Sequence, residues 1–130
     1  MDPQSRLTLE IAFETFENAG YSIDRIAGSD TGVYVGCWSH DYQMHLSRDP
    51  ENAPVYESTG ISGAVVSNRI SYFFDLKGPS LTVDTACSAS LVALHQAVLS
   101  LRSGETKQCF VAGVNLLLDP VAFMGLGRMR

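Results

Sequence analysis

The stretch LTVDTACSASLVALHQAVLSLRSG, residues 81–104, decides the fold expected for this chain of 130 residues. It opens with LTVD at 81–84, which predicts a short strand. A long apolar segment from about residue 87 to residue 102 predicts a helix, which Gly104 ends. Apolar side chains occur nearly all round this helix, so we expect it to be buried on most of its sides. Small residues crowd the junction between strand and helix, as in a sharp turn that presents a nucleophile.

Cys87 lies at this junction, in the expected first turn of the helix. Unpaired N–H groups and the positive end of the helix dipole would favour its thiolate there. The same N–H groups would receive the oxyanion that forms when a thioester is attacked. A free cysteine is also commonly just a small buried apolar residue, and the pattern alone leaves both interpretations open. Asp84, directly ahead of the turn, is expected to accept backbone N–H bonds and orient the loop.

Helices and apolar strands alternate on both sides of this stretch. The further elements expected are a helix that begins at Asp2-Pro3 and closes at Gly20, a strand at 31–37, a surface excursion at 38–60 with Pro50, Pro54 and a short helix, a helix at 61–76, a strand at 109–118 and a helix after Asp119-Pro120. This alternation predicts an α/β fold, with helices packed against a sheet.

Composition and charge exclude several classes of protein. The formal charge is −5 and no basic run is present, so we expect no nucleic-acid partner. The polar N-terminus is unlike a signal peptide, and no apolar stretch is long enough for a membrane-spanning helix. Three widely spaced cysteines without a CxxC pair argue against a structural zinc site or a disulfide framework. Together these features predict a cytoplasmic globular protein without metal.

The remaining candidate residues have less specific expectations. His95 lies too far along the helix from Cys87 for a direct nucleophile–base bond, so a role in packing of the core is expected. His40 and His45 fit surface positions, since their spacing matches no helical pair of metal ligands. Cys37 and Cys109 lie in or at the end of apolar strands and are expected to be inert buried thiols. Three single glycines (Gly32, Gly36 and Gly113) form no phosphate-binding pattern.

The segment DTACSAS, residues 84–90, resembles the active-site signature of β-ketoacyl synthase (ketosynthase) domains, with Cys87 at the acylated position. Four longer segments carry the same resemblance: DPQSRLTLEIAFETFENAG, TGVYVG, NRISYFFDLKGPSLTVDTACSASLVALH and SLRSGETKQCFVAGVNLLLDP. They cover nearly the whole chain and are most similar to type I polyketide synthases. The resemblance implies a thiolase-like α/β fold of helices on a mixed sheet, of which residues 1–130 are a partial domain truncated at both ends.

The resemblance also implies an activity and partners. An acyl chain would pass from a phosphopantetheine thioester to Cys87, and a malonyl group on an acyl carrier protein would then condense with it by decarboxylation. The product would be a β-ketoacyl thioester, the parent enzyme would be a homodimer, and no cofactor would bind directly. The family's two histidine motifs, resembling HGTGT and GHxEG, and its lysine are absent here. We therefore expect the isolated chain to be inactive and poorly soluble.

Three alternatives stay open at this point. The first is a condensing domain of a fatty-acid synthase rather than a polyketide synthase. The second is a hydrolase with its cysteine on a strand–turn–helix elbow, although the glycines of that elbow are replaced by Thr85 and Ala89. The third is a non-catalytic truncated remnant, in which Cys87 would react no faster than an ordinary free thiol.

Overall fold

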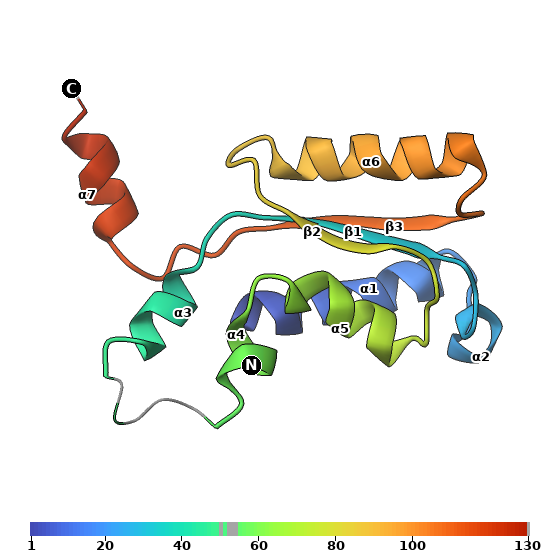
Figure 1. Cartoon of the computed structure of the whole chain (residues 1–130), viewed down its shortest axis with the longest axis horizontal. Coiled ribbons are helices and arrows are strands. Elements are labelled where there is room, and N and C mark those ends of the chain that lie inside the picture. Colours follow the sequence, from blue (N-terminus) through green and yellow to red (C-terminus); the bar gives the residue numbers. More distant parts are fainter. Residues whose placement is uncertain (50, 52–54, 130) are drawn as a thin grey trace.

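The computed structural model describes residues 1–49, 51 and 55–129, with the elements labelled in Figure 1. In chain order these elements are α1 (Pro3–Asn18), α2 (Ile23–Ile26), β1 (Gly32–Cys37), α3 (Asp41–Leu46), α4 (Glu57–Ile61), α5 (Val65–Phe73), β2 (Ser80–Val83), α6 (Ala89–Ser103), β3 (Cys109–Val114) and α7 (Val121–Gly127). The α/β class expected from the alternation of helices and strands is confirmed.

The strands form one three-stranded sheet in the order β2-β1-β3. Both pairings are parallel, and Val35 of β1 faces Thr82 of β2 and Ala112 of β3. β1 is buried along its whole length, as its continuous apolar run predicts for a central strand. A mixed sheet was expected, but the sheet of the described residues has parallel pairings only. All three strands therefore end at the same edge of the sheet.

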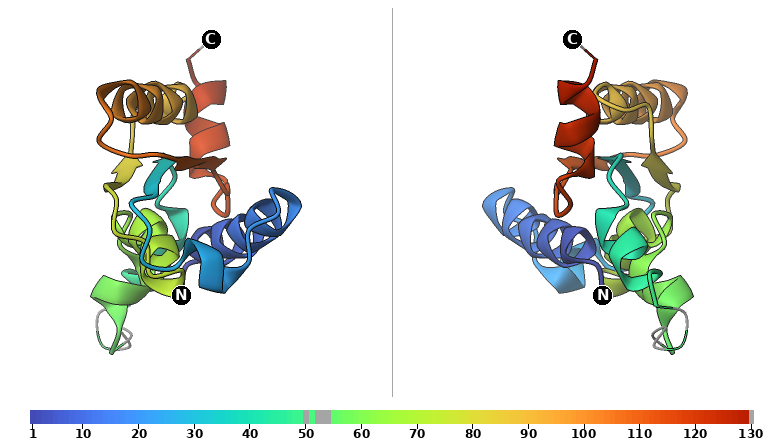
Figure 2. Two further views of the ribbon diagram at one scale, coloured as in Figure 1. Left: turned by 90° about the vertical axis from the view of Figure 1, so that its right-hand side faces the viewer. Right: turned by 90° about the vertical axis from the view of Figure 1, so that its left-hand side faces the viewer.

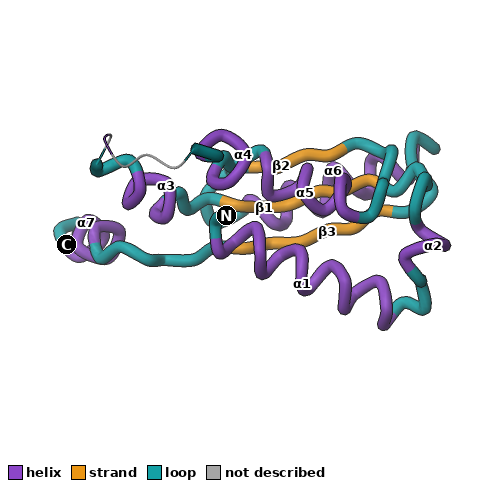
Figure 3. Tube along the Cα trace, turned by 90° about the horizontal axis from the view of Figure 1, so that it is seen from below, coloured by secondary structure: helices purple, strands orange, loops and turns teal. Residues whose placement is uncertain are grey.

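Helices cover both faces of the sheet and extend beyond its edge. α6 packs on one face, while α1 and α5 pack on the other, which gives three layers (Figures 1 and 2). Beyond the carboxyl ends of β1 and β3, the chain continues into α3 and α7, which lie at the same end of the molecule (Figure 3). No helix in the described part of the chain is long and apolar enough to cross a bilayer.

Two apolar clusters lie on opposite faces of the sheet, because successive side chains of a strand alternate. Val33 and Val35 point to the larger cluster under α1 and α5, and Tyr34 points to the smaller one under α6. In the larger cluster the ring of Phe16 meets the ring of Phe74 edge-on, with centroids 4.9 Å apart. Such edge-to-face pairs stabilise a core beyond the area they bury.

The expectation that α6 is buried on most sides is wrong. Its buried residues recur every three or four positions and face the sheet: Ala89, Ala93, Ala97 and Ser100. The opposite side, which we call the outer face of α6, carries exposed Leu91, Leu94, Val98 and Leu101. The small residues let the helix approach the sheet closely, and no described element packs over the bulky ones. The helix ends at Gly104 with φ +78°, as predicted.

The ends of the other helices and strands agree with expectation only in part. Asp2 caps α1 by accepting from the backbone nitrogen of Gln4 at 2.8 Å, as its sequence predicts. The helix expected at 61–76 is α5, which is shorter at both ends, and it begins only at Val65 because Ser62, the cap of α4, takes an extended conformation. The excursion at 38–60 holds α3 and the start of α4, whereas Pro50 and Pro54 lie outside the described residues. The last strand ends at Val114 rather than at residue 118.

Candidate active site

Cys87 lies in a tight loop between β2 and α6. The Ala86 backbone nitrogen donates to Asp84 Oδ1 at 3.0 Å, and Ser88 Oγ donates to the carbonyl oxygen of Thr85 at 2.8 Å. Ala86 has φ +51°, in the left-handed region that a residue with a Cβ rarely adopts. The Cys87 thiol is exposed at the head of this loop. The expectation that Asp84 accepts a backbone N–H bond in this loop is confirmed.

Cys87 does not lie in the first turn of α6, as its sequence suggested. The helix begins at Ala89, with Ser88 as the preceding cap residue. The backbone nitrogens of Ser88 and Ala89 already donate to the carbonyl oxygens of Thr85 and Ala86, at 3.3 and 3.0 Å. These two N–H groups are therefore engaged in closing the turn in this structure. Ala86, directly before Cys87, has a left-handed conformation, and the sequence carries no periodic signal for it. The sequence pattern therefore placed the start of the helix too early.

An open pocket of about 330 Å³ adjoins Cys87 at the carboxyl ends of the strands. Ligands of parallel α/β sheets commonly bind at this edge. One side of the pocket comes from the loop that carries Cys87 and the start of α6, and the other comes from the ends of β1 and β3 and the loops that follow them. The lining residues on that second side include Cys37, Trp38, Val114 and Asn115.

Two glycines allow the start of α6 to lie directly on the sheet beside this pocket. A Cβ atom on Gly36 would lie 2.4 Å from the backbone nitrogen of Ser90, and one on Gly113 would lie 2.7 Å from Ser90 Cβ. Both distances are too short for any side chain other than a hydrogen atom. The sequence carries no sign of this contact, since the two glycines stand singly and form no recognised motif. Their actual effect is to set the position of the helix that follows Cys87.

Gln4 and Asn115 join the two loops that form the far side of the pocket. Asn115 Oδ1 accepts from the backbone nitrogen of Ser39 at 2.8 Å. The buried Gln4 donates from Nε2 to the carbonyl oxygen of Ser39 at 2.9 Å and accepts at Oε1 from the Leu116 nitrogen at 3.0 Å. The sequence offered no signal for these bonds, since the partners come from three distant segments.

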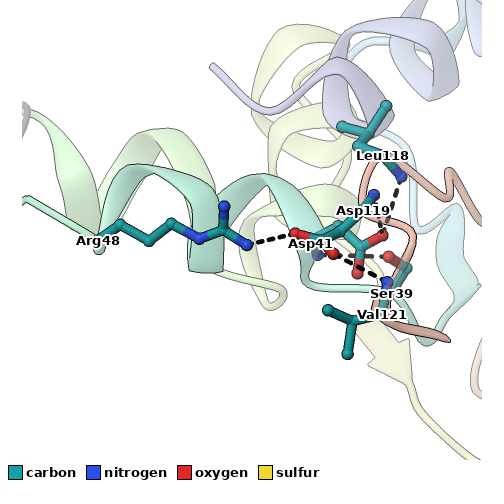
Figure 4. A network of polar contacts seen from close by, with 6 residues as sticks. All are labelled: Ser39, Asp41, Arg48, Leu118, Asp119 and Val121. Atoms are coloured by element: carbon teal, nitrogen blue, oxygen red, sulfur yellow. Dashed lines mark hydrogen bonds and ion pairs between the residues drawn. The ribbon is translucent and has the colours of Figure 1, made fainter. Parts of the chain in front are cut away.

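Asp41, at the start of α3, makes a third connection between the same loops (Figure 4). Its Oδ2 accepts from the backbone nitrogens of Leu118 and Asp119, at 2.9 and 3.0 Å. Burial raises the pKa of the Asp41 carboxyl, but the hydrogen bonds from Asp119, Leu118 and Ser39 outweigh burial and leave the pKa below its usual value. Arg48 adds an ion pair with Asp119 at the exposed side. A charged Asp41 therefore holds the loop before α7.

The other two cysteines were both expected to be buried, and they differ in burial. Cys37 lines the pocket but is buried, and its Sγ lies 3.7 Å from Gln4 Oε1. Burial raises the pKa of the Cys37 thiol to about 11, and the negative charges of Asp2 and Asp84 add to this effect. The burial expected for Cys37 is confirmed. Cys109 is only half-buried and lies 3.1 Å from Thr106 Oγ1.

None of the three histidines, all of them within the described residues, lines the pocket. His40 and His45 are exposed, which confirms the surface positions expected for them. His95 is exposed as well, so the expected packing role in the core is wrong. It lies on α6 away from the small residues that face the sheet. The described residues also contain no group of three or more His, Cys, Asp or Glu side chains that could hold a metal ion.

The sheet is parallel, the loop with Cys87 lies at its carboxyl edge, and the helix after this loop packs directly on Gly36 and Gly113. The family model of the β-ketoacyl synthase N-terminal domain matches residues 1–130, and the chain belongs to that family. Its fold is that of polyketide synthase ketosynthases. The ketosynthase from module 6 of the bacillaene synthase of Bacillus subtilis superposes with a TM-score of 0.87 at 37% identity, over 99% of this chain and 21% of that one.

Within the family, the chain is similar to highly reducing polyketide synthases. It is 65% identical to PKS6 of Gibberella zeae over 92% of its length, and 62% identical to easB of Emericella nidulans over its whole length. The matched segment is 5% of each of these relatives. The chain thus corresponds to a small part of the curated relatives that it matches.

Proposed function

We propose that Cys87 is the acyl-accepting nucleophile in the ketosynthase of a polyketide synthase. The observation that supports this most strongly is the placement of its exposed thiol on a constrained loop, beside an open pocket at the carboxyl edge of the sheet. Cys37, the other cysteine of the pocket, is buried with a raised pKa and is a poor nucleophile. The similarity to highly reducing polyketide synthases favours a polyketide product over a fatty acid.

The proposed reaction has two steps. The Cys87 thiolate attacks the carbonyl carbon of an acyl-phosphopantetheine thioester, a new C–S bond forms, and the carrier's thiolate leaves and takes up a proton. A malonyl thioester on an acyl carrier protein then loses CO₂, and the resulting carbanion attacks the acyl-cysteine. The β-ketoacyl chain leaves on the carrier, and the Cys87 thiolate is regenerated. Phosphopantetheine is thus the carrier of the substrates, and the chain itself needs no bound cofactor.

The residues of this chain suit the first step better than the second. Trp38 and Val114 offer apolar surface for an acyl chain opposite Cys87, and Asp84 and Ala86 hold the loop that presents the thiol. The malonyl carbonyl needs groups that polarise it, and the three histidines lie away from the pocket. We therefore propose that the isolated chain does not catalyse condensation. We also propose, from the family resemblance, that the active parent enzyme works as a homodimer with its carrier protein.

Mass spectrometry of the complete ketosynthase that contains this chain tests the proposal. After incubation with an acyl N-acetylcysteamine thioester, we expect the peptide with Cys87 to gain the mass of the acyl group. The Cys87→Ala variant should lose this label, whereas the matched Cys109→Ala variant should keep it. Acylation that persists in Cys87→Ala, or an unlabelled Cys87 in a folded enzyme, would exclude the proposed role and favour a non-catalytic remnant.

A further inference from the structure

The two sides of the pocket are held by separate sets of hydrogen bonds. The Cys87 side depends on the short contacts of Asp84, Thr85 and Ser88 within their own loop. The far side consists of two loops, at 38–41 and 115–119, that continue beyond the last pair of the sheet, Cys37 with Val114. A change on the far side can therefore alter the shape of the pocket without altering the nucleophile loop.

Three side chains, which we call the bridging side chains, join the loops of the far side: Gln4, Asp41 and Asn115. Together they accept from four backbone N–H groups and donate to one carbonyl group on these loops. Gln4 and Asp41 are only 3% and 8% exposed, so water competes weakly for these bonds. Trp38 and Val114, which line the pocket, are the immediate neighbours of the bonded residues.

We infer that the bridging side chains are positioning residues, which fix the far side of the pocket so that the acyl chain reaches Cys87 in the attacking geometry. This inference rests on the proposed function, because it assumes that an acyl thioester occupies the pocket. The bridging side chains do not touch the reacting atoms. Gln4 and Asp41 act through Trp38 and Val114, whose placement determines how a chain lies against Cys87, whereas Asn115 also lines the pocket itself.

The inference predicts a separation between substrate binding and thiol reactivity. In the complete ketosynthase, Asp41→Ala should raise the KM for a hexanoyl N-acetylcysteamine thioester about ten-fold, since hydrogen bonds to a carboxylate are lost and the loops shift. Acetyl transfer should change less, because a short chain makes little contact with the far side. Alkylation of Cys87 by iodoacetamide should keep its rate within about two-fold of wild type, because the nucleophile loop retains its own bonds.

Conservative and matched variants complete the experiment. Asp41→Asn keeps an acceptor oxygen and should restore most of the wild-type KM, whereas Glu14→Ala, which removes an exposed carboxylate of α1, should behave as wild type. Asn115→Ala removes an exposed side chain at little risk to folding, and should raise the KM in the same selective way. A wild-type KM in both Asp41→Ala and Asn115→Ala would overturn the inference. Parallel losses of alkylation, acetyl transfer and hexanoyl transfer in these two variants would overturn it as well. An unacylated Cys87 in the wild-type enzyme would instead refute the proposed function itself.

Discussion

Gly36 of β1 lies directly beneath the backbone of Ser90 in the first turn of α6, where a Cβ atom on Gly36 would lie 2.4 Å from the Ser90 nitrogen. The same glycine faces Val83 and Gly113 in the neighbouring strands. The start of α6, which follows Cys87, therefore packs on the sheet backbone to backbone, without a side chain of Gly36 between them. The position of the loop that carries Cys87 therefore depends on the absence of a Cβ atom at residue 36.

Gly36→Ala is expected to displace the start of α6 from the sheet. The new methyl group meets backbone atoms, which cannot rotate away, so the free energy of unfolding should fall by about 1–3 kcal/mol. Cys87 acylation should fall as well, because the loop before the helix moves with it. Urea unfolding and mass spectrometry of the complete ketosynthase measure the two effects. Gly125→Ala is the matched control, since nothing lies within 4 Å of its new Cβ atom. Equal stability of the two variants would contradict the close seating of α6.

Ala86→Gly should stabilise the folded protein. Ala86 has φ +51°, and removing its Cβ relieves a left-handed conformation at a gain of about 0.5–1 kcal/mol after the greater chain entropy of glycine is subtracted. Thermal unfolding of the variant measures this gain. Ala93→Gly, in the middle of α6, is the control with the opposite sign, because glycine within a helix costs about 1 kcal/mol. A loss of stability in Ala86→Gly would argue against the left-handed turn before Cys87.

Cys37 should make the protein less stable at alkaline pH. Its pKa rises from 9.0 to about 11 on folding, so between these values the unfolded chain loses the thiol proton while the folded protein retains it. The unfolded state binds fewer protons in that range, and the free energy of unfolding falls as the pH rises from 9 toward 11. The stability present below pH 9 should decrease by about 2 kcal/mol over this window.

Urea unfolding of wild type and Cys37→Ala at several pH values isolates this effect, since other titrating groups cancel in the difference. The stability difference between the two proteins should change with pH only above about pH 9. Cys109→Ala, at a half-buried thiol, is the matched control. Parallel pH profiles of wild type and Cys37→Ala would show that the Cys37 thiol is not desolvated.

The outer face of α6 should cause the isolated chain to self-associate. Leu91 and Leu94 are 69% and 47% exposed there, next to Val98 and Leu101, and contiguous exposed apolar surface favours association. Replacing Leu91 and Leu94 with Gln should increase the monomeric fraction in light scattering. Val55→Gln, at an exposed valine outside this face, should have little effect. A monodisperse wild-type chain would contradict the prediction.

Sequence patterns were sufficient where the determining interactions are local. Asp2 caps α1 through a residue two positions away, and Gly104 ends α6 by its own left-handed conformation. The buried strand at Gly32–Cys37 follows from a continuous apolar run. The candidate nucleophile Cys87 and the backbone hydrogen bond accepted by Asp84 also followed from neighbouring residues, because a tight turn is built from short-range bonds.

Only the tertiary structure decided the features that depend on packing between distant segments. The burial of one side of α6, the exposure of His95 and the seating of Ser90 on Gly36 depend on which element lies opposite each residue. Asp41 meets Leu118 across 77 positions of sequence, and Gln4 meets Leu116 across 112. Such pairs leave no periodic pattern, since each is created by chain segments that come together only when the sheet forms. The amino-acid sequence by itself therefore determined the candidate nucleophile and the α/β class. The tertiary structure determined the shape of the pocket around Cys87.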